Sequence, residues 1–435
     1  MNDAADAGQA IPPGVASGSG FQPAQINPLE SLLMRLRPTW MLFTMAWLIG
    51  MLQMIHPVGW GFGRGFEMSA IAKSLAANGT YADPFAPFQT GPTAVVPPLY
   101  PMAMGAVYKW APGPAGGVVL TAGNILTNAV IAALLPWLAT VLCGQAAPGI
   151  FAGLLWLGVM RLMPQWDTSF TLTALILFVG LTARGGRSWR WALASGVAAG
   201  VITLANPAAV LILGLWMMYS LWDRVSWSTA ARLLAIFGIA VLAVNTPWLV
   251  RNYRIWHALV VRSNFGMTLY ASNLDCSQST LRQGQKSGCY DGAFPVESAS
   301  EVALMNQLGE VKYDRERGAR AMEWIRAHPR RFAELTAARA VDYWFPPVEP
   351  PEHTFYAIWI VTLLSVPGMV LMARDGLRSV WVLSAICAVY PLMYYVVVSL
   401  SRYRYPIIWT SLVPAGYFLW VVAQRISPPD SARQA

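Results

Sequence analysis

Three acidic residues stand apart from the others because of where they fall in the chain. Most of the 21 Asp and Glu residues lie near the chain ends, in short joints between apolar runs, or in the charged stretch 251–353. The exceptions are Glu67, Asp83 and Asp167. A carboxylate among apolar runs is costly to keep and usually has a function. It could take a proton from a reacting hydroxyl group or bind a divalent cation.

Glu67 lies near the start of the stretch 65–79, whose sequence is GFEMSAIAKSLAANG. The spacing predicts a short amphipathic helix at a membrane interface, ended by Asn78 and Gly79. Glu67 would occupy its first turn, where the helix dipole favours a carboxylate. Its role is therefore either catalytic or confined to stabilising this helix.

A strip rich in proline follows this predicted helix. Residues 90–101, TGPTAVVPPLYP, predict an ordered turn and then an extended chain. The next run, 102–110, is too short to span a membrane and predicts a second interfacial helix. Lys109, near its end, could reach a phosphate or extend its amine to the membrane surface.

Asp167 follows Pro164-Gln-Trp and directly precedes an apolar run. It could cap the helix that begins there. Alternatively it faces Glu67 as a second carboxylate that binds the acceptor or a divalent ion, with Asp83 as another candidate ligand. Carboxylate oxygens suit Mg²⁺ or Mn²⁺, although the sequence by itself does not establish a metal.

Two arginines near the end of the chain could hold a phosphate. Arg402 and Arg404 lie two residues apart in SRYRYP, so an extended turn would project both to the same side. Guanidinium groups bind phosphate or pyrophosphate through paired N–H donors. The alternative role is to anchor lipid headgroups. Arg251 and Arg254, at the start of the charged stretch, could add to the same field.

Cys276 and Cys289 both lie in the charged stretch, with twelve residues between them. An oxidising compartment would let them form a disulfide; the alternative is two free thiols. Cys143 and Cys387 lie in or beside apolar runs and are expected to pack as small apolar residues. The sequence has no CxxC motif or His–Cys cluster that would indicate zinc.

The composition identifies the elements that must position these groups. The chain has 435 residues, of which 56% are hydrophobic and 12% are charged, and its mean hydropathy is +0.45. A soluble domain has about 25% charged residues. So apolar a chain is expected to be embedded in a membrane, with its 20 Trp and 16 Tyr enriched at the interfaces. The net charge of +9 then indicates contact with anionic lipid rather than nucleic acid.

Ten apolar runs predict an all-α polytopic membrane protein, and they lie at 38–56, 118–142, 146–163, 168–183, 190–206, 207–222, 231–250, 354–373, 378–400 and 405–423. The basic residues of the short joints fall on one side, which the positive-inside rule makes the cytoplasm; they are Arg184, Arg187, Arg190, Arg224, Arg232, Arg374, Arg378 and Arg425. The ends, 1–37 and 424–435, are then cytoplasmic tails, and the first is rich in residues typical of disorder.

Two segments on the outer side are too long for simple turns, namely 57–117 and 251–353. The second holds 12 of the 21 acids and 13 of the 30 basic residues, which indicates a small, solvated outer domain. Its part 298–342 has helical spacing. The predicted organisation is a membrane module over 38–250, this outer domain, and C-terminal membrane helices over 354–423.

These segments together resemble the membrane glycosyltransferases of the GT-C superfamily. Within it, the chain looks most like the bacterial branch of glycosyltransferase family 39, the dolichyl-phosphate-mannose protein mannosyltransferases. The resemblance runs over about 38–410 and rests on these pieces in order: GFEMSAIAKSLAANG at 65–79, Pro84-Phe85, TGPTAVVPPLYP at 90–101, PWLVRNY at 247–253, RSNFG at 262–266, HPRRF at 328–332 and RYRYP at 402–406.

The resemblance implies a GT-C-like fold and a polyprenyl-phosphate-linked sugar as donor. In that family an acidic residue of the first outer loop is the catalytic base, and this position matches Glu67. Better-known relatives have an Asp-Glu pair there, whereas this chain has Phe66-Glu67. Relatives that modify lipid A have a lysine before the Pro pair of this loop, where this chain has Val96.

The implied reaction inverts the anomeric centre, with arginines holding the phosphate leaving group and, in one version, a divalent ion assisting. The site would face the periplasm or exterior from the inner (plasma) membrane. The acceptor stays open among a glycan, a protein and a glycolipid. Two other hypotheses are a lipid or small-molecule transporter or flippase, and an inactive relative. A transporter is expected to carry charges in mid-span and broken helices in matching halves, and the apolar runs here have few such charges.

Overall fold

The computed structural model describes residues 28–55, 67–183, 185, 187–222, 224–348 and 354–426. Parts of both predicted tails, 1–27 and 427–435, and Arg184 lie outside these ranges. Contacts divide the chain into two compact units, Met1–Pro38 and Thr39–Ala435. The description that follows concerns the second unit.

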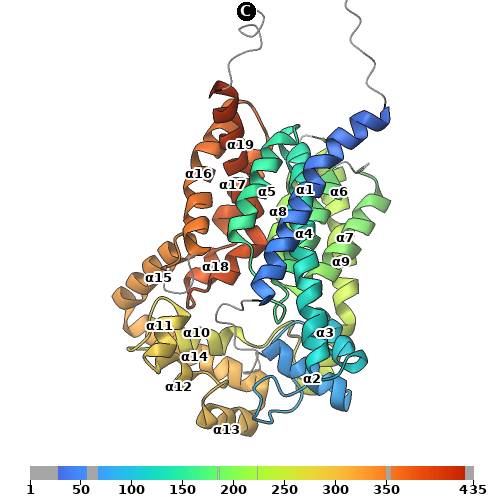
Figure 1. The fold of residues 1–435 in the computed structure, drawn as a ribbon. Helices are drawn as coiled ribbons and strands as arrows, with labels where there is room; N and C mark the ends of the chain where they lie inside the picture. The colour runs from blue at the N-terminus through green and yellow to red at the C-terminus, as the bar shows by residue number, and fades with distance from the viewer. Residues whose placement is uncertain are drawn as a thin grey trace, which may run out of the picture. The chain divides into compact units, whose positions relative to one another are not determined.

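Helices make up the regular structure of the described residues, and the only β-pairing there consists of isolated bridges (Figure 1). A helix occupies each of the ten predicted apolar runs: α1 (Pro28–Ile55), α4 (Pro114–Cys143), α5 (Ala147–Val159), α6 (Thr168–Ala183), α7 (Trp189–Ala205), α8 (Ala209–Leu221), α9 (Trp227–Trp256), α16 (Thr354–Arg374), α17 (Ser379–Val389) with α18 (Leu392–Tyr395), and α19 (Trp409–Ile426).

The long helices have the composition of membrane spans. Among the described residues, four helices are long and apolar enough to cross a bilayer. A fifth joins them if the 3₁₀ helix η1 (Ser401–Ile407) and α19, which meet at a bend of 68°, form one span. Five further apolar helices are shorter, so the expected count of ten spans stays a prediction. The protein is thus an all-α polytopic membrane protein.

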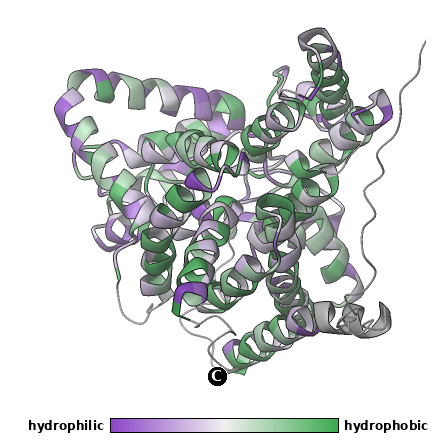
Figure 2. Cartoon of the chain, turned by 90° about the horizontal axis from the view of Figure 1, so that it is seen from above, coloured by the Kyte–Doolittle hydropathy of each residue, from purple (hydrophilic) through white to green (hydrophobic). Residues whose placement is uncertain are grey.

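Apolar side chains also cover the outward faces of these helices. Figure 2 shows hydrophobic residues on many of the helices. Large exposed examples, on α1, α9 and α16, are Trp40, Leu52, Ile239, Leu242, Leu363 and Val366. A soluble protein rarely exposes apolar surface on this scale, whereas lipid tails provide a matching solvent for it.

Glycines let the central helices approach closely. A Cβ added at Gly416 of α19 would lie 2.1 Å from the carbonyl oxygen of Pro148 at the start of α5. One added at Gly368 of α16 would lie 1.9 Å from the carbonyl oxygen of Pro414 in α19. Since helices in lipid associate largely through close van der Waals packing, small residues at such crossings are expected. Helices α5, α16 and α19 therefore pack backbone against backbone.

Two groups of helices lie outside the apolar runs. The first contains α2 (Glu67–Asn78) and α3 (Leu99–Trp110), which pack against each other. The α2 prediction is confirmed, and Gly79 ends the helix with a positive φ of 69°. Helix α3 begins at Leu99, three residues before the predicted run, because Pro101 lies in its first turn, where a proline needs no hydrogen-bond partner.

The second group follows α9 and is called here the loop segment (257–348): α10 (Phe265–Ser272), α11 (Leu281–Lys286), α12 (Cys289–Ala293), α13 (Ala299–Leu308), α14 (Glu310–Ala327) and α15 (Pro329–Trp344). Figure 1 shows these helices at the same end of the unit as α2 and α3. The helical spacing predicted over 298–342 is confirmed by α13, α14 and α15.

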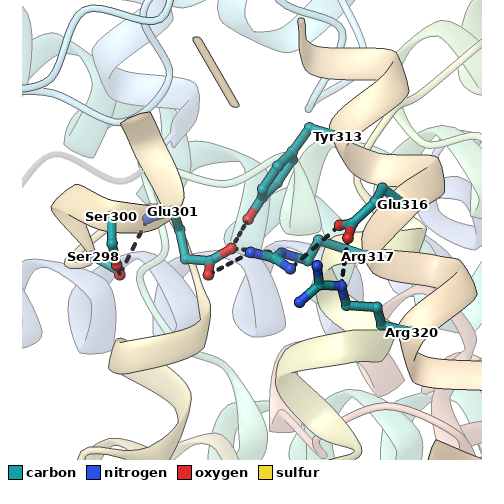
Figure 3. A network of polar contacts seen from close by, with 7 residues as sticks. All are labelled: Ser298, Ser300, Glu301, Tyr313, Glu316, Arg317 and Arg320. Atoms are coloured by element: carbon teal, nitrogen blue, oxygen red, sulfur yellow. Dashed lines mark hydrogen bonds and ion pairs between the residues drawn. The ribbon is translucent and has the colours of Figure 1, made fainter. Parts of the chain in front are cut away.

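A buried ion pair joins two helices of the loop segment. The carboxylate of Glu301 on α13 accepts two hydrogen bonds of 2.7 Å from Arg317 on α14, and one of 2.6 Å from the hydroxyl of Tyr313 (Figure 3). Arg317 also lies near Glu316, which pairs with Arg320. Because Glu301 takes up its hydrogen bonds from Arg317 and Tyr313 within the loop segment, this network is structural.

Cys276 and Cys289 form a disulfide in the loop segment, as the sequence predicts. It closes the stretch that contains α11 and ends where α12 begins. Cys143 is a buried free thiol and Cys387 is a half-buried one. Both lie in apolar helices, in agreement with the packing role expected of them.

Candidate functional site

The first-loop strip (residues 93–95) is held by partners far along the chain. The backbone N–H of Ala94 donates to the carboxylate of Glu310 at 2.7 Å, and the carbonyl of Ala94 accepts from the N–H of Ser263 at 3.0 Å. The hydroxyl of Ser263 also donates to Glu310. The start of α14 and the segment after α9 therefore fix the path of the first loop.

Arg251 also holds this loop and does not point to a ligand. Its Nη1 donates to the carbonyl of Thr93 at 2.7 Å, and its Nη2 to the carbonyl of Tyr81 at 3.1 Å. Its guanidinium lies 4.8 Å from the ring centroid of Trp248 and 5.2 Å from that of Trp256. These contacts do not favour the predicted role of Arg251 in binding the donor phosphate, because loop carbonyls and rings surround its guanidinium.

An asparagine pair in α4 fixes the joint between α5 and α6 (residues 160–167). The Oδ1 of Asn124 accepts from the backbone N–H of Met163 at 2.9 Å. Asn128 donates to Asn124 Oδ1 at 3.2 Å and to the hydroxyl of Ser169 at 3.2 Å. Buried polar groups that satisfy one another rigidify their surroundings. The end of this joint carries two site residues, Trp166 and Asp167.

Asp167 is buried directly before α6. Its Oδ2 accepts from the hydroxyl of Thr171 at 2.8 Å and from the amide of Asn206 at 3.1 Å. Burial raises the pKa of this carboxyl, while the hydrogen bonds and the charges of Arg402 and Arg262 act in the opposite direction. Asp167 therefore supports the start of α6 and also lies within the field of two arginines.

Arg402, in η1, stacks on an aromatic ring. Its guanidinium carbon lies 3.3 Å from the ring centroid of Trp166 and 5.6 Å from that of Tyr403. The Nη1 atom is buried, and among the described residues it has no hydrogen-bond partner. A guanidinium stacked flat on a ring keeps its N–H groups in its own plane, free to bind an anion through its edge. Arg402 thus has the arrangement of an anion-binding residue.

Arg404 has different surroundings, which do not favour the predicted binding of phosphate beside Arg402. It is 2% exposed. Its Nη1 donates to the carbonyl of Trp344 at 2.8 Å and to Thr362 at 2.7 Å, and its Nη2 to Ser411 at 3.3 Å. The chain here is a 3₁₀ helix and not an extended turn. With three residues per turn, side chains two apart diverge.

Glu67 and Arg402 both act on Tyr290. Glu67 is half-buried as the first residue of α2, and Tyr290 follows Cys289 of the disulfide in α12. Burial raises the pKa of Tyr290 well above its usual value; Tyr403 and Glu67 raise it further, and Arg402 lowers it. Glu67 and Arg402 come from opposite ends of the chain, and the charge of each acts on this one tyrosine.

Arg262 is a site residue that has no assigned role in the sequence analysis. Its Nε donates to the carbonyl of Val95 at 2.8 Å, and its side chain is exposed. Its charge acts on both Asp167 and Tyr394. In the sequence, the RSNFG piece of the resemblance pointed to Arg262, but it indicated no chemical role for this residue.

Asp83 and Lys109 lie apart from this group. Both the Thr90 and the Gly91 N–H donate to Asp83 Oδ1 at 2.9 Å, so this carboxylate closes its own loop. Lys109 is exposed in the last turn of α3, beside Trp110, which is 88% exposed. Its surroundings favour extension to the membrane surface over a role in phosphate binding.

The proposed metal ligands do not fit a divalent ion. Among the described residues, no three His, Cys, Asp or Glu side chains gather to hold one. Asp83 binds backbone N–H groups, and Asp167 lies in the field of Arg402 and Arg262. Positive charges beside a carboxylate oppose the binding of a second cation. The expected ligand role of these two acids is therefore not supported by their chemistry.

Comparison with known proteins found similarity at the level of structure. The sequence matches no family model and no curated protein. The apo oligosaccharyltransferase of Archaeoglobus fulgidus aligns with a TM-score of 0.55 and 11% identity, over 90% of this chain and 51% of that one. The same organism's oligosaccharyltransferase AglB, with an inhibitory peptide and a dolichol-phosphate, aligns with a TM-score of 0.52 and 12% identity, over 89% and 50%.

A third structure, the A. fulgidus oligosaccharyltransferase in complex with Zn and sulfate, aligns with a TM-score of 0.50 and 13% identity, over 88% of this chain and 49% of that one. At these identities the likeness shows that this chain shares its fold with the archaeal oligosaccharyltransferase. The chain spans about half the length of the structures it matches.

Proposed function

We propose that this protein is a membrane glycosyltransferase. It moves a sugar from a polyprenyl-phosphate-linked donor to an acceptor hydroxyl group, as a relative of the bacterial branch of glycosyltransferase family 39. The observation that carries the proposal is the placement of Arg402, which stacks on the ring of Trp166 and has a buried Nη1 without a hydrogen-bond partner among the described residues, in a fold shared with an oligosaccharyltransferase. A carboxylate for proton transfer and an unpaired guanidinium for an anion are the two groups that such a reaction needs.

The fold supports a lipid-linked donor. The neighbouring archaeal oligosaccharyltransferase was described with a dolichol-phosphate and an inhibitory peptide. In this chain, Arg402 lies at the bend that leads into the apolar helix α19. A phosphate bound there could leave its polyprenyl tail among apolar helix surfaces. The donor class is therefore a lipid phosphate carrying a sugar.

The proposed reaction is a single nucleophilic displacement at the anomeric carbon of the donor sugar. Arg402, with Arg262 in the same region, binds the donor phosphate through N–H groups. Glu67 accepts the proton of an acceptor hydroxyl while the oxygen attacks the anomeric carbon from the face opposite the phosphate. The bond from carbon to phosphate oxygen breaks, and the guanidinium charge stabilises the polyprenyl phosphate that leaves. The products are an inverted glycoside and polyprenyl phosphate.

The location follows from the same proposal. The loops with α2, α3 and the loop segment face the periplasm or exterior, because the basic joints face the cytoplasm. The acceptor is a hydroxyl group of a glycan, a protein or a glycolipid on that side of the inner membrane.

Glu67→Gln separates the chemical step from binding. We expect this variant to transfer no sugar and to bind polyprenyl monophosphate in detergent as tightly as the wild type, because the amide cannot accept the proton. Transfer is measured by glycan and glycolipid profiles in a deletion strain complemented with each variant. The matched control is Glu323→Gln on the exposed surface of α14, which should restore the wild-type profile.

Arg402→Ala tests the other half of the site. We expect it to weaken polyprenyl monophosphate binding at least tenfold, since a charge-assisted bond to phosphate is lost (about 1.5–3 kcal/mol). Arg326→Ala, an exposed arginine of α14, is the control. Wild-type transfer by Glu67→Gln, or wild-type phosphate affinity of Arg402→Ala, would contradict the proposed function.

A further inference from the structure

A short segment just before η1 is held by hydrogen bonds to the loop segment. This segment, called here the strap (residues 396–400), connects α18 to η1. The N–H of Val398 donates to the hydroxyl of Ser272 at 3.0 Å. The N–H of Ser399 donates to the carbonyl of Ser279 at 2.8 Å. Because Arg402 follows the strap by two residues, the loop segment sets where its guanidinium can lie.

Arg339 of α15 provides a buried anchor for the strap. It is fully buried. Its Nη1 donates to the carbonyl of Val396 and to Asn273 Oδ1, both at 3.1 Å, and its Nη2 donates to the carbonyl of Ser272. Asn273 in turn donates to the Val396 carbonyl at 3.0 Å. The planar guanidinium of Arg339 thereby joins the end of α10 to the start of the strap.

The partners of Arg339 are neutral, which is unusual for so deeply buried a cation. Burial lowers the pKa of its guanidinium to about 10, and the charge of Arg331 acts in the same direction. Burying an ion without an opposite charge costs several kcal/mol. An apolar residue of similar size would avoid that cost, so the fork of N–H donors is the feature that the site requires.

The same helix also contacts the chain just after Arg402. One turn beyond Arg339, the hydroxyl of Tyr343 donates to the carbonyl of Tyr403 at 3.4 Å. Its ring stacks on Tyr394, with centroids 6.3 Å apart, and Tyr394 stacks on Tyr403 at 4.5 Å. Helix α15 therefore contacts the backbone on both sides of Arg402.

We propose that Arg339 is a positioning residue for donor-phosphate binding: it fixes the strap so that Arg402 stands on Trp166 with its edge toward the phosphate. This inference rests on the proposed function of Arg402. Arg339 acts through the backbone and does not itself contact the donor.

A double-mutant cycle on the full-length protein tests this role. The affinity for polyprenyl monophosphate in detergent is measured for wild type, Arg339→Lys, Arg402→Ala and the double variant. Lysine keeps the charge and loses the fork, so we expect Arg339→Lys to bind about tenfold more weakly. The double variant should bind no more weakly than Arg402→Ala, because the effect passes through Arg402. Arg330→Lys, whose side chain is 95% exposed on the same helix, should bind as the wild type.

Each outcome of this cycle either supports or contradicts the positioning role of Arg339. Wild-type affinity of Arg339→Lys, or the same tenfold loss in the Arg402→Ala background, would overturn the positioning role. If Arg339→Lys does not fold, the same cycle with Asn273→Ala decides it, since that change removes the Oδ1 that accepts from Arg339 and the amide that donates to the Val396 carbonyl. Failure of the proposed function is distinguishable, because it appears in Arg402→Ala alone as unchanged phosphate affinity.

Discussion

At the scale of single residues, the neighbours of an arginine decide whether it can bind a ligand. The terminal Nη atoms of Arg251 and Arg404 donate to backbone carbonyls and side-chain oxygens, although the Nε of Arg404 has no hydrogen-bond partner among the described residues. Arg402 has a ring as its main neighbour, and a ring satisfies the charge without using the donors. Its buried Nη1 remains unpaired among the described residues. Arginine thus has a structural role at two of these positions, and at the third it is a candidate for binding a ligand.

Glu310 should make stability depend on pH. Burial raises its pKa from 4.5 to about 7, while bonds from Ser263, Thr93 and Ala94 act in the opposite direction. Because the folded pKa exceeds the unfolded one, the folded state keeps its proton longer, and this residue's contribution to stability falls as pH rises from about 4.5 to 7. The loss is of the order of 3 kcal/mol at most. Above pH 7 the contribution is constant.

The measurement is the thermal unfolding temperature in detergent between pH 4.5 and 8. Glu310→Gln keeps the hydrogen-bond acceptor for Ala94 and removes the titration, so its unfolding temperature should fall less over this range. Glu334→Gln on exposed α15 is the control and should follow the wild type. Parallel curves for wild type and Glu310→Gln would show that this carboxyl does not titrate in the range.

At the scale of elements, the short connections between helices position the site residues, and the long helices hold these connections in place. The joint 160–167 carries Trp166, and the strap leads into η1, which carries Arg402. Polar side chains fix both connections: Asn124 holds the first and Arg339 the second. Irregular backbone at membrane depth needs such partners, since lipid offers none.

Asn124→Ala should loosen the joint that carries Trp166. The N–H of Met163 would lose its partner, which costs about 1–3 kcal/mol when the group is buried. We expect a lower unfolding temperature together with weaker binding of polyprenyl monophosphate. The control is Thr127→Ala on the same helix, whose hydroxyl bonds only to the carbonyl of Gly123 one turn earlier. Equal phosphate affinity for Asn124→Ala and wild type would show that the joint does not position Trp166.

At the scale of the whole molecule, one disulfide within the loop segment supports both halves of the site. The stretch closed by the Cys276–Cys289 disulfide contains Ser279, which binds the strap, and is followed by Tyr290. Loss of this disulfide should therefore affect both Arg402, which follows the strap, and Glu67, whose charge acts on Tyr290.

Replacing both cysteines by serine should lower stability by about 2–4 kcal/mol, as is typical for a native disulfide. We expect the unfolding temperature of the wild type to fall to that of the Cys276→Ser, Cys289→Ser variant when reductant is added. The variant itself serves as the control, because reductant should leave it unchanged. A wild type insensitive to reductant, or a variant as stable as the oxidised protein, would contradict this expectation.

The sequence by itself determined the features that depend on local spacing. Runs of apolar residues defined the membrane helices, and Gly79 marked the end of α2. The two cysteines in the charged stretch were correctly predicted to pair. These features follow from hydrophobic length, chain stereochemistry and redox chemistry, which are properties of short stretches. The resemblance then directed attention to Glu67.

Only the tertiary structure decided which charged groups face one another. Arg402, Arg404 and Arg251 read alike in the sequence, because each stands in a motif rich in aromatic residues. Their partners come from elements far along the chain: Trp166 for the first, Trp344 for the second and the first loop for the third. Whether a guanidinium is satisfied is a property of its whole surroundings. For that reason the membrane fold could be predicted, whereas the division between structural and ligand-binding arginines could not.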